Sequence, residues 1–99
     1  MSAFTGRPDL DPPYRLSGGT RFSAWADHQS EVVRLEAQFW ISGLYWKPYQ
    51  APSVPLERPI VGPPDDVRRA VLQIQGLPPV TIDYDVWDDL GVVRLIRIR

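Results

Sequence analysis

The last twenty residues, VTIDYDVWDDLGVVRLIRIR (80–99), hold two runs of alternating apolar and polar side chains on either side of a turn. A period of two is typical of strands that bury one face. The turn sequence DLG (89–91) suits a three-residue hairpin loop with glycine in the left-handed conformation. The stretch therefore predicts an antiparallel hairpin. Its expected cross-strand pairs are Ile82 with Ile98, Asp83 with Arg97, and Asp85 with Leu95.

Three further strands are expected upstream, over residues 20–26, 31–41 and 44–49. The clearest alternation runs from 31 to 41, where every second side chain is apolar and those between are mostly polar. The dipeptide SG (42–43) is a two-residue turn signal, so the second and third of these strands would form a hairpin. The apolar set of the central strand comprises Val33, Leu35, Ala37, Phe39 and Ile41.

One helix is predicted, over residues 65–75. Asp65 and Asp66 suit a first helical turn, because negative charge there meets the helix dipole. Apolar residues then recur at helical spacing, and Gly76 suits the position after the last turn. The expected order is β-β-β-α-β-β. The fold class is thus α+β, with a five-stranded, mainly antiparallel sheet and one helix packed on one face.

The 99 residues fit one domain. We expect it to span residues 20–99, preceded by an extended arm rich in proline and glycine at 1–19. A proline-rich crossover is expected at 48–64, since that segment holds six of the eleven prolines.

Composition excludes several classes of function. The chain has no cysteine, so it can form neither a thiolate metal site nor a cysteine nucleophile. Its net charge of −1 lacks the basic excess typical of proteins that bind nucleic acid through phosphates. No apolar run suggests a signal peptide or a membrane span, and we expect a cytoplasmic protein. Common nucleotide-binding and hydrolase motifs are absent, which disfavours an enzyme and predicts no cofactor.

The expected strands leave aromatic residues on the sheet face opposite the helix. Such a face is usually polar, and aromatic residues are enriched at interface hot spots. Either the proline-rich segments cover these side chains or a partner does. The candidate interaction residues are Trp25, Trp40, Tyr45 and Tyr49.

Two alternative sites lie in the C-terminal hairpin. Acidic side chains on its first strand suggest a divalent-metal-dependent enzyme, whereas arginines on its second strand suggest contact with phosphates, with Trp87 as a stacking platform. Cross-strand ion pairing on a solvated face explains both sets without a function. The acidic set is Asp83, Asp85 and Asp88, and the basic set is Arg94, Arg97 and Arg99.

The closing strand GVVRLIRIR (91–99) is similar to the last strand of RelE/ParE-type ribosome or gyrase toxins. That family has a helical hairpin upstream of its sheet, where this sequence predicts a β-meander. The resemblance implies a toxin-like module that acts through the arginine strand. The leading interpretation is a non-catalytic protein-interaction domain, namely an accessory subunit, an inhibitor or a phage-type structural component. Its partner would be another protein or a second copy of the chain.

Overall fold

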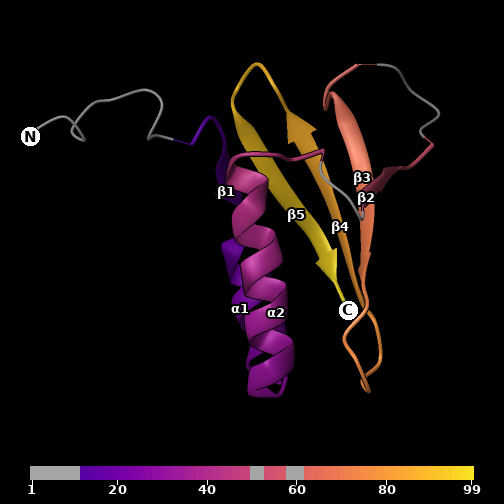
Figure 1. Cartoon of the computed structure of the whole chain (residues 1–99). Coiled ribbons are helices and arrows are strands. Elements are labelled where there is room, and N and C mark those ends of the chain that lie inside the picture. Colours follow the sequence, from indigo (N-terminus) through magenta and orange to yellow (C-terminus); the bar gives the residue numbers. More distant parts are fainter. Residues whose placement is uncertain (1–11, 50–52, 58–61) are drawn as a thin grey trace, which may run out of the picture.

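The computed structural model describes residues 12–49, 53–57 and 62–99 (Figure 1). It confirms the α+β class, with a five-stranded, mostly antiparallel sheet, but it contains two α-helices rather than one. The elements in chain order are β1 (Arg15–Ser17), α1 (Gly19–Ala26), α2 (Glu31–Ser42), a 3-10 helix η3 (Gly43–Tyr45), β2 (Ser53–Pro55), β3 (Asp66–Leu72), β4 (Val80–Trp87) and β5 (Val92–Ile98).

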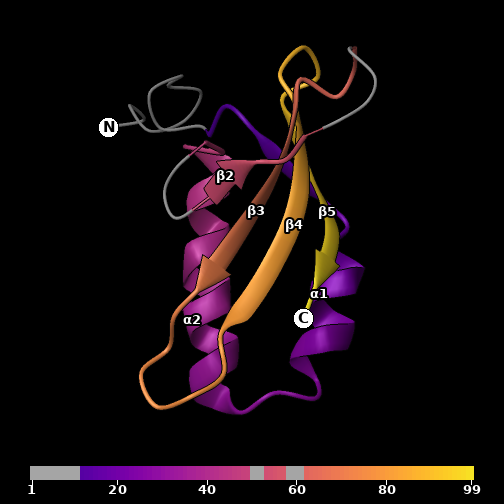
Figure 2. The same cartoon turned by 90° about the vertical axis from the view of Figure 1, so that its right-hand side faces the viewer.

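The strands lie in the order β1-β5-β4-β3-β2. Every neighbouring pair is antiparallel except β1 and β5, which run parallel. Both α-helices lie on one face of the sheet, α1 beside β5 and α2 nearer to β3 and β4 (Figure 2). No helix or strand of the described residues covers the opposite face, which we call the open face.

The predicted C-terminal hairpin is confirmed as β4 and β5. Its open end has the expected register, with Ile82 opposite Ile98 and Asp83 opposite Arg97. An irregularity between Asp83 and Tyr84 then shifts the pairing by one residue, so that Asp85 faces Arg94 and not Leu95. At the turn Gly91 has φ +61°, and a side chain there would also collide with the carbonyl oxygen of Pro13.

The predicted meander over 20–26, 31–41 and 44–49 is wrong, because these segments form α1, α2 and η3. Ser30 caps α2, its hydroxyl accepting a hydrogen bond from the Val33 amide at 3.4 Å, and Glu31 occupies the first turn. The alternation was misleading because α2 is apolar on two opposite faces. Val33, Ala37 and Ile41 pack inward, whereas Leu35 and Phe39, which fall between them in sequence, point outward.

The predicted helix over 65–75 is also wrong, because this segment contains strand β3, which pairs with both β2 and β4. Strand β3 lacks a clear alternation of apolar and polar residues, because the face that points toward the helices also carries polar residues. Ala70 and Leu72 are buried there, but Asp66 and Arg68 share the same face. Gly76, with φ +76°, lies in the turn after the strand instead of ending a helix.

The segment expected as an N-terminal arm contributes to the sheet through β1. Gly18 then allows the chain to turn into α1, since it has φ +85° and a side chain there would lie 2.8 Å from the Leu95 carbonyl oxygen. Within the expected crossover at 48–64, β2 pairs with β3. Residues 1–11, 50–52 and 58–61, which belong to these two predicted segments, lie outside the described residues.

The hydrophobic core lies between the sheet and the helices. Tyr84 is fully buried at the centre of β4, where the edge of the Trp40 ring meets it with ring centroids 5.9 Å apart. Helix α2 is thus anchored across the middle of the sheet. The buried core residues are Val33, Ala37, Ile41, Leu44, Ala70, Leu72, Val80, Ile82, Tyr84, Val86, Val93 and Leu95.

Candidate docking surface

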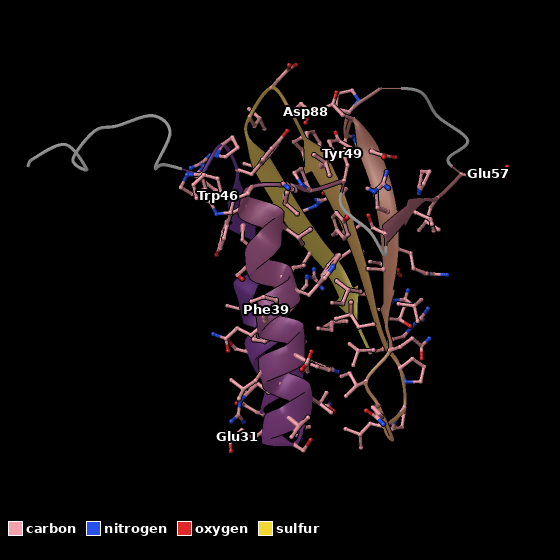
Figure 3. All side chains as sticks on the ribbon, in the orientation of Figure 1. Glu31, Phe39, Trp46, Tyr49, Glu57 and Asp88 are labelled. Carbon is pink, nitrogen blue, oxygen red and sulfur yellow. The ribbon has the colours of Figure 1, made fainter. Side chains whose placement is uncertain are left out.

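The side of α2 that points away from the sheet is apolar. Phe39 is 80% exposed, Leu35 52% and Val32 57%, and Trp46, just beyond the helix, is 48% exposed. Phe39 and Trp46 lie along the side of α2 away from β3 and β4 (Figure 3). We call these four residues the outer stripe. Around its C-terminal half the surface is hollowed into a groove of about 400 Å³, lined in part by Phe39, Trp40 and Trp46.

A helix at the surface of a monomeric protein normally has one apolar face, which packs on the core, and an opposite polar face. Helix α2 buries Val33, Ala37 and Ile41 on the core side and still presents the outer stripe to solvent. A helix with apolar residues on both sides is typical of one that is covered on both sides. Contiguous exposed apolar side chains of this kind mark interaction sites.

The structure does not bring the four predicted interaction residues together on one surface. Trp25 is half-buried beside Phe22, with ring centroids 5.8 Å apart, and Trp40 is half-buried against Tyr84. Tyr45 is also half-buried. Tyr49 alone is exposed, at 42%, and its hydroxyl is hydrogen-bonded within the protein.

The outer stripe was missed because Leu35 and Phe39 were assigned to the core face of a strand. A signal was present in the sequence, however. Read as a helix, residues 31–42 place Val33, Ala37 and Ile41 on one side and Val32, Leu35 and Phe39 on the other. Trp46 lies one further turn along the second set.

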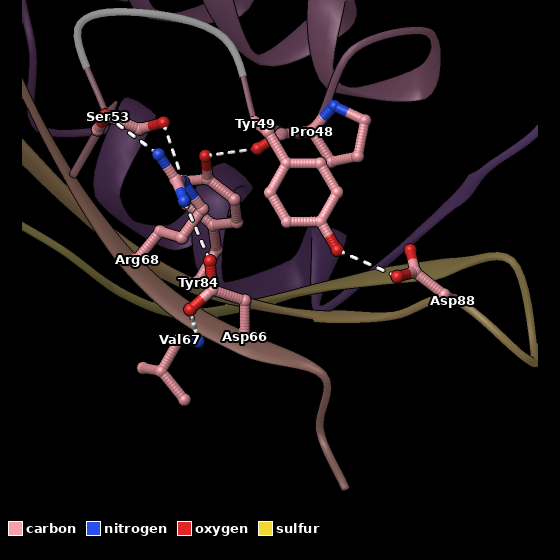
Figure 4. A network of polar contacts seen from close by, with 8 residues as sticks. All are labelled: Pro48, Tyr49, Ser53, Asp66, Val67, Arg68, Tyr84 and Asp88. Atoms are coloured by element: carbon pink, nitrogen blue, oxygen red, sulfur yellow. Dashed lines mark hydrogen bonds and ion pairs between the residues drawn. The ribbon is translucent and has the colours of Figure 1, made fainter. Parts of the chain in front are cut away.

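Asp88, in the β4–β5 turn, holds two distant segments against the hairpin. Its carboxylate accepts hydrogen bonds from the hydroxyl of Tyr14 at 2.8 Å and from that of Tyr49 at 2.9 Å, and its amide donates to Asp65. Figure 4 shows the bond from Tyr49 to Asp88. The bond to Asp88 raises the pKa of Tyr14, and burial followed by the bond to Asp88 raises the pKa of Tyr49. Both tyrosines are therefore held protonated as donors and are poor nucleophiles.

Arg68 forms the other half of this network, on the helix side of the sheet. Its guanidinium donates to the hydroxyl and carbonyl oxygens of Ser53 and to the Asp66 carboxylate, and it lies 5.3 Å from the Tyr49 ring centroid (Figure 4). Nearby, the Tyr84 hydroxyl donates to the Pro48 carbonyl. These bonds hold the segment after α2 against the sheet, so the network has a structural explanation.

The open face carries two carboxylates that are buried under arginines. Asp83 binds the Arg69 guanidinium through two hydrogen bonds of 2.7 and 3.0 Å. Asp85, only 1% exposed, accepts from Arg94 and from the Trp87 indole N–H, and the Arg94 guanidinium lies 5.7 Å from the Trp87 ring centroid. Both acids are therefore neutralised by paired cations.

These positions separate the predicted metal ligands. Asp83 and Asp85 are engaged by arginines on the open face, while Asp88 accepts from tyrosines at the hairpin turn. Among the described residues, no group of three or more acidic or histidine side chains is placed to hold a metal ion. The ion-paired explanation of the acidic strand agrees with this geometry.

The Arg69 guanidinium holds the pKa of Asp83 below its ordinary value, with smaller contributions from Arg99 and Arg97. A lowered pKa contributes stability above the unfolded-state pKa of about 3.9, and this contribution is lost as the pH falls through the folded-state value. We expect Asp83→Asn to lower the free energy of unfolding by about 1 kcal/mol at pH 7. Below the folded-state pKa of Asp83, the variant and wild type should have the same free energy of unfolding. Urea unfolding from pH 7 to pH 2 measures this; a difference independent of pH would contradict the ion pair.

Comparison with known proteins does not assign the chain. No protein-family model, curated protein or solved structure matches it. None of the helices that the structure describes is long and apolar enough to cross a bilayer.

Proposed function

We propose that this chain is a non-catalytic protein-interaction domain of the cytoplasm and that the outer stripe of α2 is its docking surface. The observation that carries the proposal is the 80% exposure of Phe39 in the C-terminal half of a helix whose other side is buried in the core. Aromatic side chains flanked by other apolar groups supply most of the binding free energy at protein interfaces. The groove between Phe39 and Trp46 supplies a hollow for a side chain of the partner.

The proposal places the main contact on Phe39 and Trp46, beside the predicted residues Trp40 and Tyr45, which line the same groove. Trp40 supports the site from beneath, since it lines the groove and packs on Tyr84. Tyr49 stabilises the network at the hairpin turn and lies outside the stripe. The partner is therefore expected to contact Phe39 and Trp46 and to leave Tyr49 bonded to Asp88.

The proposal is tested by capture of partners from the native host with a tagged chain, in parallel for wild type, Phe39→Glu and Val54→Glu. Val54 is also exposed, at 56%, but lies on β2 away from the outer stripe, so it controls for the added charge. We expect a stoichiometric protein, either a host protein or the untagged chain, to be retained by wild type and Val54→Glu. Phe39→Glu should lose it by at least tenfold. Equal recovery by all three forms would refute the docking surface.

A nucleic-acid-binding or RelE/ParE-toxin-like module is the second candidate. Two observations favour it. The chain has a helical hairpin, α1–α2, upstream of strands β2 to β5, as the toxins have upstream of their sheet, although the short strand β1 precedes it here. In addition, Arg94 and Arg97 are exposed on β5 opposite Asp85 and Asp83, with Trp87 beside Arg94. Pairing of Arg94 with Asp85 weakens this candidate, because the guanidinium is already neutralised.

Fluorescence anisotropy of a labelled single-stranded RNA at low salt tests the second candidate. Binding through phosphates would weaken steeply as salt is added. It would also be reduced severalfold by Arg97→Ala and not by Arg21→Ala, a matched exposed arginine on α1. A flat titration at low salt removes the candidate.

A further inference from the structure

The outward residues of α2 follow the spacing of a coiled-coil seam. Val32, Leu35, Phe39 and Ser42 are separated by steps of three, four and three residues, and Trp46 follows four residues after Ser42, beyond the end of α2. This is the pattern in which one helix packs along another helix of similar length. The residues that pack on the sheet fall at the remaining positions of the heptad, so the seam is free of the protein's own core.

Charges at the two ends of the seam are opposite. Glu31 occupies the first turn of α2, with Glu36 one turn further on, while exposed Lys47 follows the C-terminal end. Arg34 is half-buried on the flank of the helix. Two copies of α2 packed in parallel would set Glu31 against Glu31. Packed antiparallel, they bring Lys47 toward the end that carries Glu31, and the helix dipoles also oppose each other favourably.

We propose that a second copy of this chain covers the outer stripe, with the two α2 helices antiparallel about a twofold axis. The inference rests on the proposed docking function and names its partner. In the antiparallel register that we propose, Leu35 packs against the partner's Phe39. The same register places Val32 beside the partner's Ser42. Such an interface is isologous, because the same residues contribute from both subunits.

The size of the seam sets the strength of this dimer. A standard interface buries roughly 800 Å² per partner. Here each α2 helix contributes three exposed apolar side chains, Val32, Leu35 and Phe39, which form the centre of a smaller interface with a charged rim. We therefore expect a reversible dimer whose population depends on protein concentration. The gradual shift from 11.3 kDa toward twice that mass is the expected signature.

Sedimentation velocity of the purified full chain over micromolar to hundreds of micromolar concentrations tests the dimer. Wild type and the control Leu90→Glu, which adds a charge to an exposed apolar residue in the β4–β5 turn, should both approach twice the monomer mass. Leu35→Glu and Phe39→Lys should each remain monomeric. Circular dichroism of each variant establishes that it is folded.

Mixing the two monomeric variants tests the antiparallel register. The twofold axis gives two contacts between positions 35 and 39 in each dimer. In the mixture, one of these contacts joins Glu at position 35 of one chain to Lys at position 39 of the other. The second contact keeps the wild-type Phe39 of the first chain and Leu35 of the other. A heterodimer should therefore form with at least tenfold higher affinity than either variant has for itself. A parallel pair would gain no such contact, so failure to recover a dimer overturns the proposed register.

A wild-type chain that stays monomeric throughout the concentration range overturns the inference. This failure is distinct from failure of the docking function. If wild type is monomeric but Phe39→Glu still abolishes capture of a host protein, the docking surface stands and its partner is another protein. If neither association is observed, both proposals fall.

Discussion

Tyr84→Ala is expected to lower the free energy of unfolding by about 3–5 kcal/mol, the range for removal of a large buried aromatic side chain. Tyr84 is fully buried at the centre of β4, where its ring meets Trp40 of α2 and its hydroxyl donates to the Pro48 carbonyl. One substitution therefore removes contacts that join the sheet to the helix and to the segment after it. Urea unfolding followed by circular dichroism measures the loss.

Tyr84→Phe is the matched control, because it keeps the ring and removes only the hydroxyl. A net cost of about 1 kcal/mol is expected, the usual value of one hydrogen bond. An alanine variant within 1 kcal/mol of wild type would mean that α2 does not pack across the middle of the sheet. The outer stripe would then have no defined orientation.

Arg94→Leu is expected to cost about 3 kcal/mol, although the Arg94 side chain is 52% exposed. The cost arises at its partner, since the Asp85 side chain is only 2% exposed and would keep the Trp87 indole as its one remaining side-chain donor. Removing one member of a buried ion pair is more harmful than removing both, because it leaves an uncompensated charge. The same unfolding measurement reports the loss.

A double variant and a surface control distinguish this explanation from simple loss of surface area. Asp85→Asn combined with Arg94→Leu should recover at least 1 kcal/mol relative to Arg94→Leu alone. Arg97→Leu, on the same strand and also exposed, should stay within about 0.5 kcal/mol of wild type. Equal losses for the Arg94 and Arg97 variants would show that Asp85 does not depend on its pair.

The sequence predicts the C-terminal hairpin well because Tyr84 and Val86 alternate with Asp83 and Asp85 around a glycine turn. Residue pairing near the turn was less predictable. The one-residue irregularity between Asp83 and Tyr84 lets Asp85 meet Arg94. The sequence marks it only by the consecutive apolar residues Leu95 and Ile96, which interrupt the alternation.

The helical hairpin could not be read from alternation, and the reason bears on function. A surface helix with one apolar stripe would have shown a period near 3.6, but in α2 the inner and outer stripes interleave and imitate a strand. Helical capping by Ser30 was the competing signal. Segment 66–72 was misread in the opposite direction, since Arg68 and Asp66 occupy positions on its core-facing side.

The sequence predicts an interaction surface made of aromatic side chains, and the residues that the structure exposes in the outer stripe differ from the predicted ones. The sequence contains more aromatic and apolar side chains than the predicted core can bury. Which of them face outward depends on the helical assignment. A strand places Trp40 outside and Phe39 in the core, whereas in the structure Phe39 is exposed and Trp40 is half-buried against Tyr84. The ion pairing of Asp83 and Asp85 was foreseen, although Arg69 was not among the expected partners.

Photo-crosslinking in the native host tests the central claim most directly. A benzophenone amino acid would replace Phe39 in the outer stripe, and a second form would carry it at Leu90, which is exposed at 63% on the hairpin turn. We expect one discrete protein adduct from position 39, of the chain's own mass or of another partner, and none from position 90. Absence of an adduct at 39, or the same adducts from both positions, would contradict the claim that the outer face of α2 is covered.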